Sequence, residues 1–169
     1  MISLFFQYVG RFILFVLVQL LILNNIQFSG LINPYLYIMF IIILPFETPN
    51  WLILFTAFAL GISIDSFTNT LGMHTSATLL IAFIRPYVLK IMAPREGYDT
   101  GTLPRIKFYG LQWFIRYSLI ITVVHHFFLF YLEVFRLSDF FLTFSRAFIS
   151  SIFTMILILL THYLLFKNK

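Results

Sequence analysis

The chain has 169 residues, of which 61% are hydrophobic, 20% are aromatic and only 10% are charged, and its mean hydropathy is +0.98. A water-soluble domain of this length cannot bury so much apolar surface, so the composition excludes a soluble protein and predicts an integral membrane protein. The net charge of +5 does not indicate nucleic-acid binding, because the basic residues are scattered singly and form no cluster for backbone phosphates. The chain contains no cysteine, which excludes disulfides and thiolate metal sites.

Apolar stretches separated by turn residues predict a single all-α domain over residues 1–169, a compact bundle of about six transmembrane helices. The first stretch has no basic segment before it and no small-residue cleavage site after it. We therefore expect it to be retained as a span rather than removed as a signal peptide. The predicted spans are 4–24, 31–45, 50–66, 75–92, 109–132 and 140–166.

The second and third predicted spans are short. At about 1.5 Å per residue, each helix covers only about 22–26 Å, which is less than the roughly 30 Å hydrocarbon core. Two alternatives follow for 31–45 and 50–66: they cross a locally thinned bilayer, or they form a re-entrant hairpin around the sequence LPFETPN. Both alternatives leave an even number of crossings, so both termini are expected on the same side of the membrane.

Lysine and arginine are unevenly distributed among the predicted loops. The loops at 25–33 and 66–74 contain neither, whereas basic residues gather in or beside the loop at 93–108 and in the C-terminal tail. The positive-inside rule therefore predicts that this loop and both termini are cytoplasmic. The basic residues concerned are Lys90, Arg95, Arg105, Lys107, Lys167 and Lys169.

Three arginines are predicted at similar depths in the cytoplasmic half of the bundle, namely Arg11, Arg85 and Arg116. Glu47 lies in the turn between the second and third spans, and we expect it to pair with one of them, because a charge inside a bilayer is usually partnered. Snorkelling toward the head groups is the alternative explanation for Arg11 and Arg116. Arg85 differs because Pro86 follows it: a proline in a span frees a carbonyl one turn earlier, which a nearby guanidinium or an adjacent helix can satisfy.

Asp65 ends the third predicted span at the opposite edge of the membrane. One interpretation pairs its carboxylate with Arg146 on the sixth span, or with His125 or His126 on the fifth. The other interpretation makes it a cap for exposed backbone N–H groups in the following turn, SFTNTLG. Both interpretations give Asp65 a structural role, and a chemical role of the carboxylate is the remaining alternative.

No catalytic or metal-binding pattern is present in the sequence. It lacks a His-Glu-x-x-His zinc motif, a Gly-x-Ser-x-Gly nucleophile motif and a Gly-rich phosphate loop. His125 and His126 are adjacent and so point about 100° apart on a helix, while His74 and His162 are isolated. We therefore expect hydrogen-bonding roles for the histidines, with no enzymatic activity, no cofactor and no metal site.

The segment LPFETPNWLILFTAFALGISIDSFTNTLGMHTSATLLIAFIRPYVLKIMAPREGY resembles the MreD family of rod shape-determining membrane proteins of bacteria. The likeness continues in GLQWFIRYSLI, VHHFFLFYLEVF and SDFFLTFSRA, so it covers most of the chain. The features that carry it are the turn around Glu47, Gly61-x-x-x-Asp65, Leu71-Gly72-x-His74, Ala82-Phe83-x-Arg85-Pro86 and Pro94-Arg95-Glu96-Gly97-Tyr98.

This resemblance implies a non-enzymatic scaffold subunit of the cell-elongation machinery, a multi-pass protein of the bacterial inner membrane. Such a subunit is expected to bind MreC and, through it, RodA and a penicillin-binding transpeptidase, with a link to MreB filaments, and so to help organise peptidoglycan synthesis. The candidate structural or partner-contact residues are Glu47, Asp65, Gly72, His74, Arg85, Pro86, Arg116 and Arg146.

The arrangement of spans is also similar to the six-helix substrate-binding subunits of energy-coupling-factor vitamin transporters. This likeness gives the alternative function, a small-molecule binding subunit of a membrane transporter. Such subunits carry a face of small residues on the first helix for the transport partner, whereas in VGRFILFVLVQLLIL the only small residue is Gly10. That departure favours the scaffold, and likeness of fold alone does not transfer function.

Overall fold

The computed structural model describes residues 2–26, 32–135 and 139–166, and the secondary-structure elements formed by these residues are helices. The all-α prediction is therefore confirmed for the described part of the chain. Four segments are long and apolar enough to cross a membrane: Phe6–Asn25, Asn50–Thr68, Ile106–Val134 and Phe140–Phe166. The α-helices are α1 (Ile2–Leu17), α2 (Met39–Ile42), α3 (Asn50–Thr68), α4 (Met73–Ile91), α5 (Ile106–Val134) and α6 (Phe140–Phe166). A π-helical turn (Val18–Ile22) and a 3-10 turn (Leu23–Asn25) extend α1. Another 3-10 turn (Leu36–Ile38) leads into α2.

The prediction of a membrane-crossing helix over 31–45 is wrong. The helical part consists of a 3-10 turn of 3 residues and α2 of 4 residues, which together cover about 10–12 Å of a hydrocarbon core roughly 30 Å thick. The apolar side chains from Leu36 to Leu44 are only 0–5% exposed. This run is apolar because other helices surround it. Hydropathy alone does not distinguish a segment buried in protein from a segment that faces lipid.

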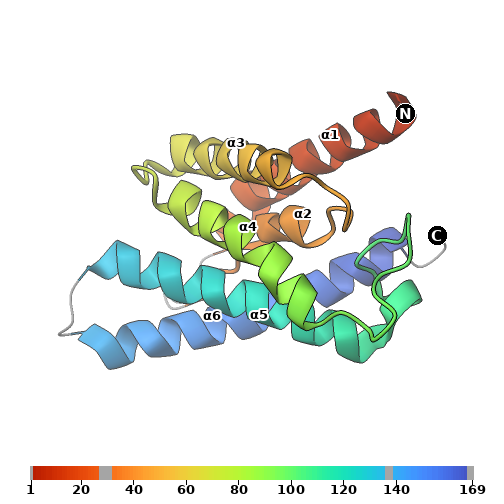
Figure 1. The fold of residues 1–169 in the computed structure, drawn as a ribbon. Coiled ribbons are helices and arrows are strands. Elements are labelled where there is room, and N and C mark those ends of the chain that lie inside the picture. Colours follow the sequence, from red (N-terminus) through yellow and green to blue (C-terminus); the bar gives the residue numbers. More distant parts are fainter. Residues whose placement is uncertain (1, 27–31, 136–138, 167–169) are drawn as a thin grey trace.

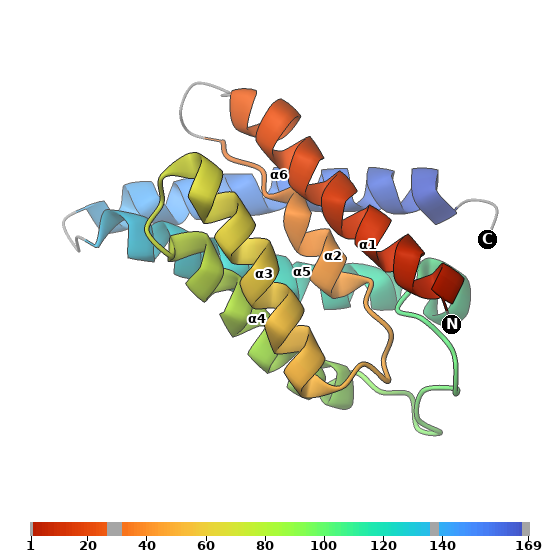
Figure 2. The ribbon, with the colours of Figure 1, turned by 90° about the horizontal axis from the view of Figure 1, so that it is seen from above.

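The helices form layers around α2 and α4. Figure 1 shows α1 and α3 on one side and α5 and α6 on the other, with α2 and α4 between them. Along the bundle, α3 packs against α4, α4 against α5 and α5 against α6, while α1 contacts α2 and α3. Figure 2 shows α1 running alongside the short α2.

The two ends of the bundle differ in charge. The start of α1, the end of α6, the turn at 45–49 and the loop at 92–105 all lie at one end (Figures 1 and 2). We call it the basic end, and we call the opposite end, where α3 turns into α4, the distal end. The start of α1 and the end of α6 therefore lie at the same end of the bundle. The described basic residues at the basic end are Arg11, Lys90, Arg95, Arg105 and Lys107.

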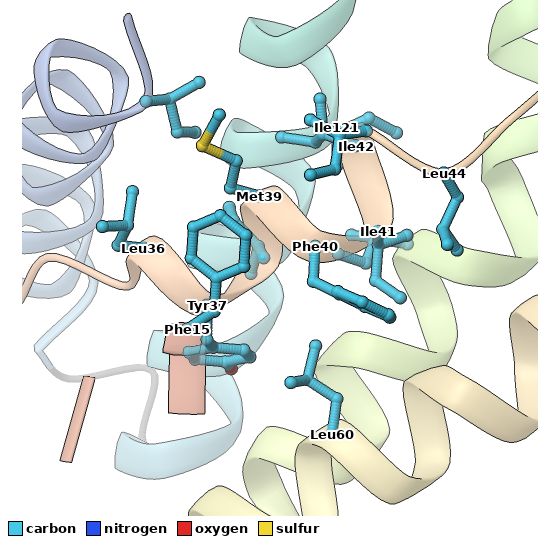
Figure 3. Close-up of a cluster of buried hydrophobic side chains, with 14 of the residues drawn as sticks. Phe15, Leu36, Tyr37, Met39, Phe40, Ile41, Ile42, Leu44, Leu60 and Ile121 are labelled. Atoms are coloured by element: carbon cyan, nitrogen blue, oxygen red, sulfur yellow. The ribbon is translucent and has the colours of Figure 1, made fainter. Parts of the chain in front are cut away.

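Apolar side chains from three other helices pack around α2. Phe15 of α1, Leu60 of α3 and Ile121 of α5 surround it (Figure 3) and are 0–1% exposed. No solvent therefore reaches the backbone at the two ends of α2. Every backbone N–H and C=O there needs a protein partner, because an unsatisfied group at membrane depth costs several kcal/mol.

A glycine allows α3 and α4 to pack closely. A Cβ atom added to Gly61 would lie 2.4 Å from the Cα atom of Thr75 and 3.1 Å from the carbonyl oxygen of His74. Only a residue without a side chain fits this contact. The contact places Asp65, one helical turn further along α3, beside the first residues of α4.

The long helix α5 is kinked near its start. Gly110 has φ 81° and ψ 165°, a backbone conformation outside the helical region that is essentially restricted to glycine. The predicted span 109–132 begins at this kink. The regular helix that follows it therefore corresponds to the predicted span.

Candidate functional site: polar groups around a buried helix

Side chains of α6 bind the extended backbone that leads into α2. The amide of Asn33 donates to Ser150 Oγ at 3.0 Å, and the amide of Tyr35 donates to Thr154 Oγ1 at 3.0 Å. Ser150 and Thr154 are both 0% exposed. They lie four residues apart and so project from the same face of α6. This face supplies the acceptors that a continuous helix would have supplied itself.

Gln19 connects α1 to the same segment. Its side chain is 1% exposed, and its Nε2 donates to the carbonyl oxygen of Pro34 at 3.0 Å and to Asn24 Oδ1 at 2.8 Å. Its Oε1 accepts from the amide of Tyr37 at 3.4 Å. The sequence reasoning missed this residue, although a glutamine inside the first apolar run is a signal, because a polar group in a span requires a partner.

Arg85 binds the other end of α2. Its side chain is 1% exposed, and its Nη2 donates to the carbonyl oxygens of Leu44 and, at 3.3 Å, of Pro45. Its Nε donates to the hydroxyl of Tyr117 at 3.0 Å, and this hydroxyl donates to the carbonyl oxygen of Ile42 at 3.2 Å. The last carbonyls of a helix have no partner within the helix. Arg85 and Tyr117 supply the missing donors from α4 and α5.

The expected ion pair of Glu47 with an arginine is wrong. Glu47 is exposed, and its Oε1 accepts from the amide of Gly101 at 3.0 Å. Among the described residues no ion pair joins it to Arg11, Arg85 or Arg116, and Arg85 is occupied by carbonyls rather than by a carboxylate. Its contact links the turn at 45–49 to the loop at 92–105.

Aromatic packing holds the same loop in place. The ring of Tyr98 stacks on that of Phe46 with centroids 4.1 Å apart, and its hydroxyl donates to the carbonyl oxygen of Leu89 at 2.7 Å. Burial raises the pKa of Tyr98 to about 12, so the hydroxyl keeps its proton and remains a donor at neutral pH. The loop is therefore a fixed surface at the basic end.

The other two arginines of the basic half contact no carboxylate in the described part of the chain. Arg116 is exposed on α5, whereas the guanidinium of Arg11 lies 5.3 Å from the ring centroids of both Tyr8 and Phe166. Both placements fit the snorkelling alternative, in which the apolar stem lies along the bundle and the charge reaches the head groups.

Asp65 is a cap for α4. Its Oδ1 accepts from Thr70 Oγ1 at 2.6 Å and from the amide of His74 at 3.0 Å. Its Oδ2 accepts from the amide of Thr75 at 2.8 Å and from Thr75 Oγ1 at 2.6 Å. Gly72 occupies the N-cap position in a left-handed conformation, with φ 81°, and has no side chain to cap the helix. Asp65 on α3 does so instead, which confirms the capping interpretation.

The alternative pairing of Asp65 with Arg146 is wrong. The guanidinium of Arg146 lies 5.2 Å from the ring centroid of Phe130, and its Nε is buried with no hydrogen-bond partner in the described structure. The four donors to Asp65 come from the α3–α4 region. Pro86 lies inside α4 as expected.

Tyr37 joins two histidines in the core. Its hydroxyl lies 2.9 Å from His74 Nδ1 and 2.7 Å from His125 Nε2, and all three side chains are 0–5% exposed. The neighbouring His126 contacts the Thr122 carbonyl rather than this group. No sequence pattern predicts this arrangement, because the three residues are far apart along the chain.

Replacing Tyr37 by phenylalanine should lower the free energy of unfolding by about 2–4 kcal/mol. The change removes two buried hydrogen bonds and leaves a nitrogen of His74 and one of His125 unsatisfied. Equilibrium unfolding in detergent measures the loss. Tyr87→Phe is the control, because Tyr87 is 58% exposed. Equal stabilities of the two variants would contradict the role of Tyr37.

Two hollows lie at opposite ends of the molecule. One is a cavity of about 460 Å³ whose lining includes Tyr35, His74 and Glu133. The other is a groove of about 430 Å³ between α1 and α3, with Phe40 and Leu44 among its lining residues. In the part of the chain that the structure describes, no group of three or more His, Cys, Asp or Glu residues could hold a metal ion.

Comparisons with protein families, with curated proteins and with solved structures find no match for this chain. The resemblance to the MreD family therefore depends on the residues themselves. Function has to be argued from the groove, the cavity and the buried contacts around α2.

Proposed function

We propose that this chain is a non-enzymatic scaffold subunit of the bacterial cell-elongation machinery, which binds MreC in the inner membrane with its basic end in the cytoplasm. In this proposal the helices α1 to α6 form the membrane bundle, with the short α2 buried among the others. The buried polar groups support the proposal: Gln19, Asp65 and Arg85 all hydrogen-bond to backbone groups of the bundle, which is a structural use of polar side chains.

The observation that carries the proposal is the groove between α1 and α3, which we call the α1–α3 groove. Val9 and Phe12 form one wall, Leu52 and Thr56 form the other, and Phe40 lies between them. Helices in lipid associate through close packing, since lipid is as apolar as their side chains. A preformed apolar hollow along two spans is therefore a suitable seat for a further membrane helix.

The charge at the end of the groove would suit a partner helix with a basic flank, as expected for the single membrane helix of MreC. Glu47 lies in the lining at the basic end, where the flank of a span is typically rich in lysine and arginine by the positive-inside rule. A partner helix with its basic flank in the cytoplasm would place that flank beside Glu47. RodA, the transpeptidase and MreB would then connect through MreC.

Replacing Thr56 by tryptophan should weaken co-purification of full-length MreC by about tenfold or more, which corresponds to about 1.4 kcal/mol. The indole would fill the α1–α3 groove. The hydroxyl of Thr56 donates only to the carbonyl oxygens of Leu52 and Ile53 in its own helix, so no contact between helices is lost. Quantitative pull-down from detergent extract at equal expression measures the effect.

Ile156→Trp is the matched control, because Ile156 is 56% exposed on α6 and outside the groove lining. The chain contains no cysteine, so Val9→Cys and Ile156→Cys each give a unique thiol for cross-linking to a cysteine in the MreC helix. Cross-linking from position 9 and not from position 156 is expected. The α1–α3 groove would be excluded as the binding site if Thr56→Trp bound MreC as well as the unchanged protein. Equal cross-linking from positions 9 and 156 would also exclude it.

The distal cavity favours the second candidate function, a vitamin-type binding subunit of a transporter. Its volume of about 460 Å³ lies in the range of small-molecule sites. Within VGRFILFVLVQLLIL the only small residue is Gly10, which counts against this candidate because a transport partner would need a face of small residues. The transporter subunit would become the favoured function if the purified protein bound a vitamin tightly and cells without the gene kept their normal shape.

A further inference from the structure

The distal cavity combines polar groups with an opening toward the apolar surface. It lies between the end of α1, the segment at 33–35, the α3–α4 turn and the last turns of α5. Leu21 and Phe67 belong to its lining and are 67% and 75% exposed. A ligand in the cavity can therefore reach both a polar interior and the surrounding acyl chains.

His74 presents an N–H donor to this cavity. The Nδ1 atom of His125 is buried with no partner among the described residues, and a buried unpaired N–H is more costly than a bare acceptor. The proton of neutral His125 is therefore assigned to Nε2, which donates to the Tyr37 hydroxyl. We assign the proton of this hydroxyl to the hydrogen bond with His74 Nδ1, which places the proton of neutral His74 on Nε2, and His74 is among the residues that line the cavity.

Further donors surround the same space. The hydroxyl of Tyr35 and the side-chain amide of Asn33 have no hydrogen-bond partner in the described structure, and both residues line the cavity. The ring of Tyr35 packs against that of His74 with centroids 5.1 Å apart. Three side chains with hydrogen-bond donors in the lining of one hollow favour a ligand group rich in acceptor oxygens.

One acid completes the lining. Glu133 is exposed at the rim and forms no ion pair within the described residues. Asp65 lies behind the wall with both oxygens occupied, and the guanidinium of Arg146 is directed to Phe130. The carboxylate of Glu133 is therefore a place for a cationic group at the rim, near the hydroxyl of Tyr35.

From this arrangement we infer that the distal cavity binds a zwitterionic headgroup that carries both a primary ammonium and a phosphate, as in an aminophospholipid. The phosphate oxygens accept from His74, Tyr35 and Asn33, and the ammonium lies against Glu133. The acyl chains leave past Leu21 and Phe67 into the bilayer. This inference is independent of the α1–α3 groove, because the two hollows share no lining residue.

The test measures binding to the purified full chain in detergent by calorimetry and by the shift in thermal unfolding. The probes are dihexanoyl-phosphatidylethanolamine, dihexanoyl-phosphatidylglycerol, which lacks the ammonium, and O-phosphoethanolamine, which lacks the chains. We expect the first lipid to bind about tenfold more tightly than the second, since a charge-assisted contact is lost in the latter. Glu133→Gln should abolish this preference, and Tyr35→Phe should weaken binding of both lipids.

Glu96→Gln is the matched control, because Glu96 is an exposed carboxylate in the loop at 92–105 and lines neither hollow, and it should bind like the unchanged protein. Binding of O-phosphoethanolamine as tightly as the lipid would support the zwitterion site and assign it a soluble ligand. Equal binding of the two lipids, unchanged binding by Glu133→Gln, or no binding of any probe would overturn the inference.

Discussion

Replacing Arg85 by methionine should lower the free energy of unfolding by about 3–5 kcal/mol, because three acceptors lose a donor and each buried group left unsatisfied costs about 1–3 kcal/mol. Methionine fills most of the same space, so the loss comes from hydrogen bonding rather than from an empty cavity. The carbonyl oxygens of Leu44 and Pro45 and the hydroxyl of Tyr117 would each lose a donor. Equilibrium unfolding in detergent, followed by circular dichroism, measures the change.

Arg116→Met is the matched control for Arg85→Met. Arg116 is exposed on α5, and a surface change of this kind usually alters stability by no more than about 0.5 kcal/mol. Arg85→Lys should be intermediate, since an ammonium keeps the charge but cannot reproduce the fork of the guanidinium. If Arg85→Met and Arg116→Met had equal stabilities, Arg85 would not be the group that satisfies the end of α2.

Replacing Gly61 by alanine should destabilise the protein by about 1–3 kcal/mol or more, the range found for overpacked cores. The new methyl group would lie 2.4 Å from the Cα atom of Thr75, and a backbone atom cannot move away by changing its rotamer. The helices α3 and α4 would have to separate. This separation would also lengthen the hydrogen bonds that the Asp65 carboxylate accepts from the amides of His74 and Thr75. Thermal unfolding in detergent reports the loss.

Gly10→Ala provides the control, because a Cβ added to Gly10 meets nothing within 4 Å and alanine favours a helix over glycine by about 1 kcal/mol. It should be neutral or stabilising. The double variant Gly61→Ala with Asp65→Ala tests the coupling: its loss should be smaller than the sum of the two single losses, since both act on the same contact. Strict additivity, or a Gly61→Ala protein as stable as the unchanged one, would contradict the close approach.

Features that depend on neighbours in the chain or on lipid could be predicted from the sequence. The predicted span 140–166 has the bounds of α6, and 50–66 lies within α3, because lipid-facing helices are apolar over their whole length. The capping role of Asp65 was among the predicted alternatives because its partners lie only 5–10 residues away. Contacts between residues that are close along the chain can therefore be predicted from the sequence.

Features that depend on distant residues were not predictable. Tyr37 meets His125 across 88 positions, and Arg85 meets Leu44 across 41; neither spacing has a periodicity. The run at 31–45 looks like a lipid-facing span because burial in protein and burial in lipid select the same side chains. Gln19 was the one available signal that irregular backbone lay beside the first helix.

The contacts between α6 and the segment before α2 also impose an order on synthesis. The amides of Asn33 and Tyr35 find their acceptors 117 and 119 residues later in the chain. At roughly 5–20 residues per second, the ribosome needs about 6–24 s to deliver them. We expect these amides to stay hydrated until then, so that this stretch remains at the membrane surface and enters the bundle last. A nascent chain halted after α5 would leave it outside.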